Sequence, residues 1–129
     1  NGVGMAAQLE EFLGDGPLGY NLDGKGFPAT APLTAKLGQT VLIRMIDEGQ
    51  LVHTMHLHGF HFQIVARDGF PIASPVMADT LAIAPGEVYD VLVKADSPGV
   101  WAFHCHVLSH AEGPQGMFGM VTALIVQPA

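Results

Sequence analysis

Short apolar runs separated by glycine and proline turns are the feature that most restricts how this chain can fold. The runs are rich in Val, Ile, Phe and Thr, and turns such as 36–39, 68–69 and 97–99 recur between them. Short strands at this spacing are typical of antiparallel sandwiches and barrels. The chain shows no long apolar stripe of the kind that marks a helix. The sequence therefore predicts an all-β fold with Greek-key connections.

The turns divide the chain into predicted elements. Residues 1–17 are expected to form an N-terminal arm or interdomain linker, with a short helical turn around 5–13 and no part in a sheet. Residues 18–129 are expected to form one domain, which begins with a short strand near 18–22 and a loop over 20–32. Further strands are predicted at 40–46, 51–55, 60–66, 80–83, 87–94, 100–104 and 116–126.

Composition excludes several classes of protein. The length of 129 residues suits one domain, and 49% apolar with 13% charged residues is not the composition of a disordered chain. A formal charge of −7 argues against nucleic-acid binding. No apolar run reaches the ~18 residues of a membrane helix, so no membrane partner is expected. Residues 1–16 lack the basic start of a signal peptide.

All seven histidines fall within 53–61 and 104–110, and the only cysteine lies in the second of these clusters. A single cysteine cannot form an intrachain disulfide. A lone cysteine is usually a small buried hydrophobe, but imidazoles in the patterns HxxHxH and HCHxxxH would be poor core fillers. The clusters therefore indicate metal ligands. His61 lies outside both patterns, and we do not expect it to bind metal.

The alternation of side chains along a strand predicts two sets of ligands on opposite faces. In the second cluster, Cys105 faces away from His104 and His106. In the first cluster, His56 and His58 share a face, and His53 lies at an odd offset from both. The predicted sets are Cys105, His53 and His110 on one side, and His56, His58, His104 and His106 on the other.

The first set has the chemistry of a blue-copper site. One thiolate and two imidazoles suit copper, usually with a weak axial methionine, whereas zinc normally takes four firm ligands. Met117 is the first candidate for the axial position, Met120 the second and Met55 the third. The second set contains only imidazoles, which suits copper that binds and reduces a small molecule.

Two segments resemble the ligand elements of the multicopper oxidases. HTMHLHGFHF is similar to the HxxHxH element of the family, and WAFHCHVLSH is similar to its HCHxxxH element. ADTLAIAPGEVYDVLVKADSPGVWAFHCH resembles the approach to the second element, and the likeness covers roughly residues 18–127. It implies a cupredoxin-like Greek-key β-sandwich or barrel, copper as the cofactor, and the C-terminal domain of a laccase-like enzyme.

The resemblance also implies a role for each ligand. A type 1 copper, where electrons enter, would be held by the set that contains Cys105, with Met117 as the axial ligand. Electrons would then pass along Cys105 to His104 or His106 and reduce dioxygen to water at a cluster. The implied ligands are His53, Cys105 and His110 for type 1 copper, His56 for type 2 copper, and His58, His104 and His106 for the type 3 pair.

The sequence departs from the family pattern after His110. The family often has an axial Met or Leu five residues after this histidine, whereas this chain has Gln115 at that position. Three-domain members often have a carboxylate directly after the second type 1 histidine, and here the first carboxylate is Glu112, one position later. Glu112 is a candidate for proton supply, although it could equally be a solvated loop residue. Asp79 is a candidate for orienting a ligand histidine.

The resemblance implies partners as well. In the family each of two domains supplies four histidines to the cluster, and this chain has only four to give. A second cupredoxin domain or another copy of the chain would complete the cluster, and a symmetric homo-oligomer could supply that copy. The expected substrates are a small-molecule electron donor and dioxygen. A periplasmic or extracellular location is expected because the family is mostly exported.

Two other functions are compatible with the motifs. The chain could be an isolated blue-copper electron-transfer module with an incomplete cluster. It could also be a nitrite-reductase-like copper protein, but that family usually lacks the second histidine of HCH, so His106 argues against this function.

Overall fold

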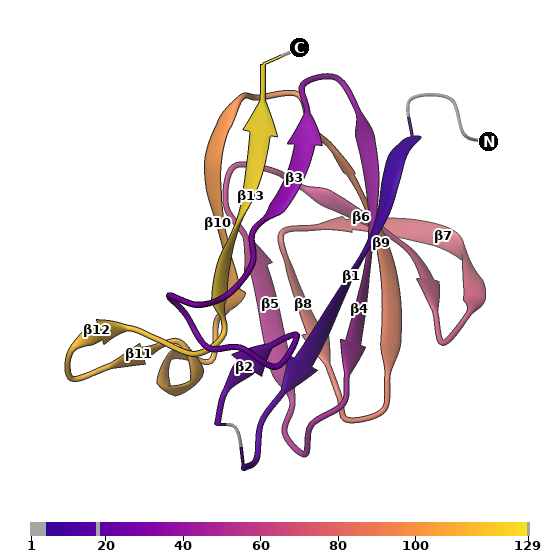
Figure 1. Cartoon of the computed structure of the whole chain (residues 1–129). Helices are drawn as coiled ribbons and strands as arrows, with labels where there is room; N and C mark the ends of the chain where they lie inside the picture. The colour runs from indigo at the N-terminus through magenta and orange to yellow at the C-terminus, as the bar shows by residue number, and fades with distance from the viewer. Residues whose placement is uncertain (1–4, 18, 129) are drawn as a thin grey trace.

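Two β-sheets pack face to face in the computed structural model, which describes residues 5–17 and 19–128 (Figure 1). The six-stranded sheet contains, in spatial order, β2 (Asn21–Leu22), β1 (Met5–Gly14), β4 (Thr40–Asp47), β9 (Val88–Lys94), β6 (Phe62–Arg67) and β7 (Phe70–Ala78). The five-stranded sheet contains β3 (Leu33–Lys36), β13 (Val121–Gln127), β10 (Gly99–Cys105), β5 (His53–Leu57) and β8 (Thr80–Ile83). The prediction of an all-β fold is therefore confirmed.

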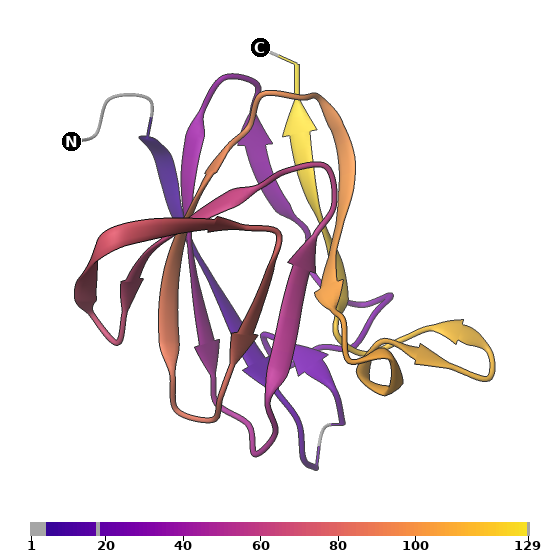
Figure 2. The ribbon, with the colours of Figure 1, turned by 180° about the vertical axis from the view of Figure 1, so that it is seen from behind.

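The connection from β10 to β13 carries the remaining elements. A 3-10 turn, η1 (Leu108–His110), is followed by a hairpin of β11 (Glu112–Gly113) and β12 (Gly116–Met117). The hairpin projects from one side of the sandwich, and β6 and β7 lie on the other side (Figures 1 and 2). Within the described part of the chain, no helix has the length and apolar character needed to cross a membrane.

The core lies between the sheets and is built by alternate residues of each strand. In β4 every second residue is buried, and β5 shows the same alternation. Ile43 and Val91 of one sheet and Ile83 and Leu124 of the other are almost completely buried. Burying an apolar side chain of this size contributes about 1.5–3 kcal/mol, so the alternation fixes which face of each strand points inward.

The expected helical turn over 5–13 is wrong, and so is the expectation that this segment lies outside the sheet. Strand β1 pairs in parallel with β4 over most of its length and antiparallel with β2. Burial alternates with a period of two: Leu13 is fully buried, and its neighbour Phe12 is exposed. The partner β4 is distant in sequence, so no local turn signal announces this strand.

Three further differences concern strands and turns. Strands β3 and β7 were not expected. Strand β7 contains Pro71 and Pro75, and it lies at the edge of its sheet, where proline is tolerated. The predicted strand 116–126 is divided, because 116–117 belong to the hairpin and the core strand begins at Val121. Residues 1–4 of the predicted arm, Leu18 of the predicted first strand, and residue 129 lie outside the described residues.

Glu11 of β1 is an acidic residue at an inward-facing position. Its side chain is buried, and its Oε1 atom has no hydrogen-bond partner. Burial, and then the nearby carboxylate of Asp23, raise the pKa of Glu11 to about 9. A neutral carboxylic acid is therefore the form that the folded chain accommodates at neutral pH.

Glu11→Gln should stabilise the protein at neutral and alkaline pH. Because the pKa of Glu11 is higher in the folded chain than in the unfolded chain, the free energy of unfolding falls as pH rises from about 4.5 towards 9. The amide removes this penalty, which amounts to at most about 3 kcal/mol at pH 7. Urea unfolding at pH 5 and pH 8 measures the effect, with the exposed Glu10→Gln as the matched control. An equal pH dependence in parent and variant would contradict the assignment.

Candidate metal centre

Strands β5 and β10 are neighbours and carry most of the predicted ligands. Their antiparallel register places Cys105 opposite Met55, and His104 opposite His56. Cross-strand partners share a face of the sheet. The Cys105 thiol therefore points into the sandwich, where it is fully buried, while His56 and His104 lie together on the outer face and are partly exposed.

Three donor atoms converge inside the sandwich at the end of β10, and we call their residues the buried triad (His53, Cys105 and His110). The two Nδ1 atoms of His53 and His110 are 3.1 Å apart. The Sγ atom of Cys105 is 3.9 Å from Nδ1 of His53 and 3.6 Å from Nδ1 of His110. All three side chains are buried, and their donor atoms lie within 4.8 Å of one another. This donor set fits copper, because thiolate and imidazole are ligands that copper favours.

The two histidines of the buried triad have different electrostatic surroundings. Burial alone would lower the pKa of His53, but hydrogen bonds with Cys105 and Asp15 and the charge of Asp47 raise it above its usual value. Burial lowers the pKa of His110, and the nearby His53 lowers it further. Metals bind neutral imidazole. Metal binding at the triad would therefore release the second ring proton, which the raised pKa of His53 stabilises in the metal-free chain.

The remaining four predicted ligands gather on the outer side of the five-stranded sheet. We call them the four-histidine face (His56, His58, His104 and His106). Their ring centroids are 4.9–5.7 Å apart in the five closest pairs. His58 and His106 are exposed, and the other two are partly exposed. The face is thus open on the side away from the core.

Hydrogen bonds orient two of these imidazoles. Nδ1 of His56 lies 2.9 Å from the carbonyl oxygen of Asp79, and Nδ1 of His104 lies 3.0 Å from the carbonyl oxygen of Cys105. A carbonyl only accepts, so both Nδ1 atoms carry a proton, and Nε2 is the nitrogen that each ring can offer to a metal ion. Nε2 of His104 lies 3.1 Å from Nε2 of His58.

The crowding of imidazoles also disfavours the charged form of His58. Burial lowers the pKa of His58, and the neighbouring His104, His56 and His106 lower it further. Metal ions bind the neutral form of imidazole, which is the form that these neighbours favour for His58. The donor chemistry of the four-histidine face therefore fits copper as well.

The three methionine candidates lie in different places. Met117, the first candidate, is 60% exposed on the hairpin that projects from the sandwich. The structure does not bring it to the buried triad, because the longer loop folds into β11–β12. Met120 is fully buried, and its backbone hydrogen-bonds to the amide of Cys105 and to the carbonyl of His110. Met55 is also buried, opposite Cys105.

The other predicted residues have less direct contacts. Glu112 is exposed on β11, and among the described residues no hydrogen bond or ion pair joins it to either ligand set. Asp79 lies between two histidines: its carboxylate oxygens are 3.7 Å from Nδ1 of His56 and 3.9 Å from Nε2 of His61. His61 itself is exposed.

A sequence profile described as "Multicopper oxidase" matches residues 5–128. The chain belongs to the multicopper oxidase family. Members of this family bind copper, in agreement with the predicted cofactor. The match begins within β1, the strand that the sequence analysis assigned to an arm.

Individual multicopper oxidases show the same likeness. The chain is 33% identical over 105 residues to Multicopper oxidase MmcO of Mycobacterium tuberculosis, covering 81% of this chain and 19% of that protein. It is 35% identical over 114 residues to Copper resistance protein A of Pseudomonas syringae pv. tomato, covering 88% of this chain and 17% of that protein. The chain therefore spans less than a fifth of the length of these relatives.

Solved structures of the family confirm the cupredoxin-like fold. The Blue Copper Oxidase of Nitrosomonas europaea superimposes with a TM-score of 0.86 at 32% sequence identity, covering 98% of this chain and 45% of that one. The multicopper oxidase mgLAC gives a TM-score of 0.84 at 32% identity, covering 96% and 44%.

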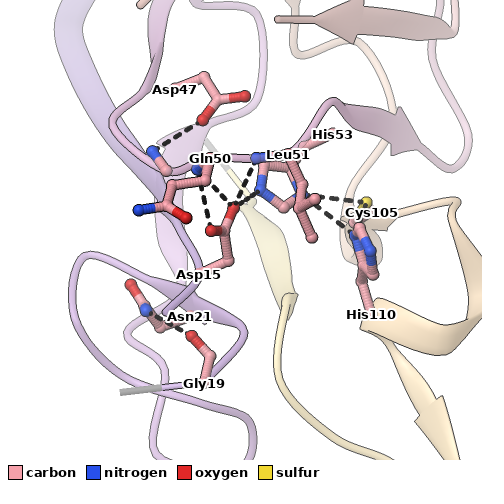
Figure 3. A network of polar contacts seen from close by, with 10 residues as sticks. Asp15, Gly19, Asn21, Asp47, Gln50, Leu51, His53, Cys105 and His110 are labelled. Atoms are coloured by element: carbon pink, nitrogen blue, oxygen red, sulfur yellow. Dashed lines mark hydrogen bonds and ion pairs between the residues drawn. The ribbon is translucent and has the colours of Figure 1, made fainter. Parts of the chain in front are cut away.

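Two residues that contact the buried triad were not anticipated. Asp15, in the turn between β1 and β2, contacts His53 (Figure 3). Tyr20 stacks on the ring of His110, with centroids 4.2 Å apart and planes 20° from parallel. Nothing in the sequence around either residue indicates a metal site, because the contact depends on how the N-terminal strand folds against β4.

Gly59 fixes the backbone directly after His58. Its φ of +79° favours glycine, and a Cβ atom there would overlap the ring of Trp101. Gly86 has a similar φ of +83° but open space around it.

Gly59→Ala should therefore destabilise the multicopper oxidase domain more than Gly86→Ala. Both variants incur the backbone penalty of about 1–2 kcal/mol, and only Gly59→Ala adds overpacking of about 1–3 kcal/mol. Urea unfolding of both variants measures the difference. Equal losses would show that the Trp101 ring moves aside freely.

Proposed function

We propose that this chain is the copper-binding domain of a laccase-like multicopper oxidase. On this proposal the buried triad would hold a type 1 copper that takes electrons from a reductant. Cys105 and His104 or His106 would link it to the four-histidine face, where type 2 and type 3 copper would supply the chemistry for reducing dioxygen to water. The observation that carries the proposal is the alternation around Cys105, whose thiol lies in the buried triad while both chain neighbours lie on the four-histidine face.

The protein's own residues divide the work between the two sites. The buried triad would hold the type 1 copper away from water, because all three of its side chains are buried. On the outer face, His56 would bind the type 2 copper, and His58, His104 and His106 the type 3 pair. Copper supplies one-electron redox chemistry at both sites, whereas the backbone between residues 104 and 106 provides the short covalent link.

A second cupredoxin domain or another copy of the chain would complete the cluster. The outer face of the five-stranded sheet supports this part of the proposal, because across β13, β10, β5 and β8 its residues carry no charged side chain. These residues are Val121, Ala123, Ile125, Val100, Ala102, His104, Thr54, His56, Thr80 and Ala82. A sheet face that meets water is usually polar, so this face is suited to a protein partner, as in a homo-oligomer.

Glu112 is left with no proposed role in catalysis.

Two expectations about the surroundings remain predictions. A small-molecule electron donor would approach the sandwich near His110, where η1 and the hairpin meet. A periplasmic or extracellular location remains an expectation from the family resemblance.

Copper content and colour test the proposal. Copper-loaded parent protein should show the intense blue absorption of a thiolate–copper site, and Cys105→Ser should abolish it, because oxygen is a poor substitute for the soft thiolate. Copper per chain, measured together with the molecular mass in solution, separates the alternatives. Two or more copper ions per chain in an oligomer that consumes dioxygen supports the oxidase. One blue copper in a monomer supports an electron-transfer module, and no blue copper excludes both.

We propose that Met120, rather than Met117, would supply the weak thioether ligand of a copper ion held by the buried triad, because Met120 is buried and its backbone contacts Cys105 and His110. Met120→Leu should shift the visible spectrum and raise the reduction potential, because loss of the thioether removes a ligand that stabilises Cu(II). Met117→Leu should change neither quantity, since its side chain is largely exposed on the hairpin. Redox titration of both variants measures the effect. A shift in Met117→Leu alone would restore the original candidate.

A further inference from the structure

Asp15 reaches the buried triad from the turn between β1 and β2. Its Oδ2 atom lies 2.8 Å from Nε2 of His53, which is the ring nitrogen that faces away from Cys105 (Figure 3). The Asp15 side chain is 7% exposed and that of His53 is fully buried. A carboxylate is thus in direct contact with a proposed copper ligand on the side away from the metal.

The position of this carboxylate is fixed by backbone donors. The amide of Gln50 lies 2.9 Å and 3.1 Å from the two carboxylate oxygens, and the amide of Leu51 lies 3.2 Å from Oδ2. Gly49 leaves the space that the carboxylate occupies, because a Cβ atom there would overlap Asp15. Burial alone would raise the pKa of Asp15, but these amides and His53 together hold it below its usual value. Asp15 therefore ties the loop that precedes β5 to the end of β1.

The contact determines which nitrogen of His53 faces the metal. An ionised carboxylate only accepts hydrogen bonds, so Nε2 carries the proton and donates it to Asp15. In the neutral imidazole that binds a metal ion, Nδ1 then has its lone pair directed at Sγ of Cys105 and Nδ1 of His110. A hydrogen bond on the outer nitrogen is the usual means of fixing the tautomer and raising the basicity of a metal-binding histidine.

The charge of Asp15 has a second consequence. A negative charge near a poorly solvated site stabilises a doubly charged ion more than a singly charged one. Solvent reaches little of the Asp15 side chain, so screening is weak there. The carboxylate would thus favour Cu(II) over Cu(I) in the buried triad.

We propose that Asp15 is a positioning residue for the type 1 copper, which fixes the tautomer and orientation of His53 and lowers the reduction potential of the site. This inference rests on the proposed function, because it takes the buried triad as a copper site. It assigns a role in electron transfer to the turn that follows the N-terminal strand, whose sequence carries none of the copper motifs.

The test compares Asp15→Asn and Asp15→Ala with the parent in redox titrations of the copper-loaded chain. Loss of such an outer partner typically weakens metal binding about 10–100-fold. We expect Cu(II) binding to weaken about tenfold more than Cu(I) binding in Asp15→Ala, which raises the potential by about 59 mV. Asp15→Asn keeps the size and one acceptor oxygen, so it should raise the potential with a smaller loss of thermal stability. The control is Asp96→Asn, which removes an exposed charge beyond the opposite end of β10 and should leave the potential unchanged.

A second measurement does not depend on the potential. Cu(I) is diamagnetic, so nuclear magnetic resonance of the nitrogen-15-labelled Cu(I) chain can follow the Nε2–H proton of His53. This proton should exchange slowly with water in the parent and rapidly in Asp15→Ala. Unchanged potential and unchanged exchange in both Asp15 variants, with only a lower melting temperature, would overturn the proposal and leave Asp15 as a loop anchor. A parent chain that forms no blue copper would overturn the proposed function and this inference together.

Discussion

The antiparallel pairing of β5 with β10 is the constraint on which both candidate sites depend. Its register sets Cys105 opposite Met55 and His104 opposite His56, so one pairing directs the thiol inward and the imidazoles outward. A shift by one residue would exchange the two faces of either strand. The apolar residues that alternate with the ligands prevent this shift, because Met55, Leu57 and Phe103 would lose their buried positions. Packing of the core and placement of the predicted ligands are thus enforced by the same contacts.

The surroundings of the buried triad come from much more of the chain than the two histidine motifs. Asp15 contacts His53 from the turn that follows the first strand, and Tyr20 stacks on His110 from the same connection. Met120 is buried and ties two members of the triad together through backbone hydrogen bonds with Cys105 and His110. The motifs supply the donor atoms, whereas these other segments set their orientation, their solvent exposure and their electrostatic field.

The sequence was sufficient to predict the fold class and to divide the cysteine and histidines of the two motifs between two faces, because both follow from a period of two along strands. It was insufficient for β1, whose inward-facing Glu11 hides the apolar alternation and whose partner β4 is distant in sequence. The hairpin that carries Met117 was missed for a related reason: the length of the loop was readable, but the direction in which it folds depends on tertiary contacts. Asp15 could not have been found, since its contact with His53 joins residues that only the parallel β1–β4 pairing brings near each other.

That parallel pairing has a consequence for the order in which the protein matures. Parallel and long-range strand pairs form late, because a long loop must close before any contact compensates for the lost chain entropy. The pocket around Cys105 needs β1 for Asp15, β5 for His53 and the segment before β13 for Met120, so it is assembled only after these long-range pairings exist. Until then the thiol lies in an open chain, exposed to oxidants and to chance metal ions. The complete buried triad, with Asp15 and Met120 around it, is therefore available to a metal ion only once the sandwich has closed.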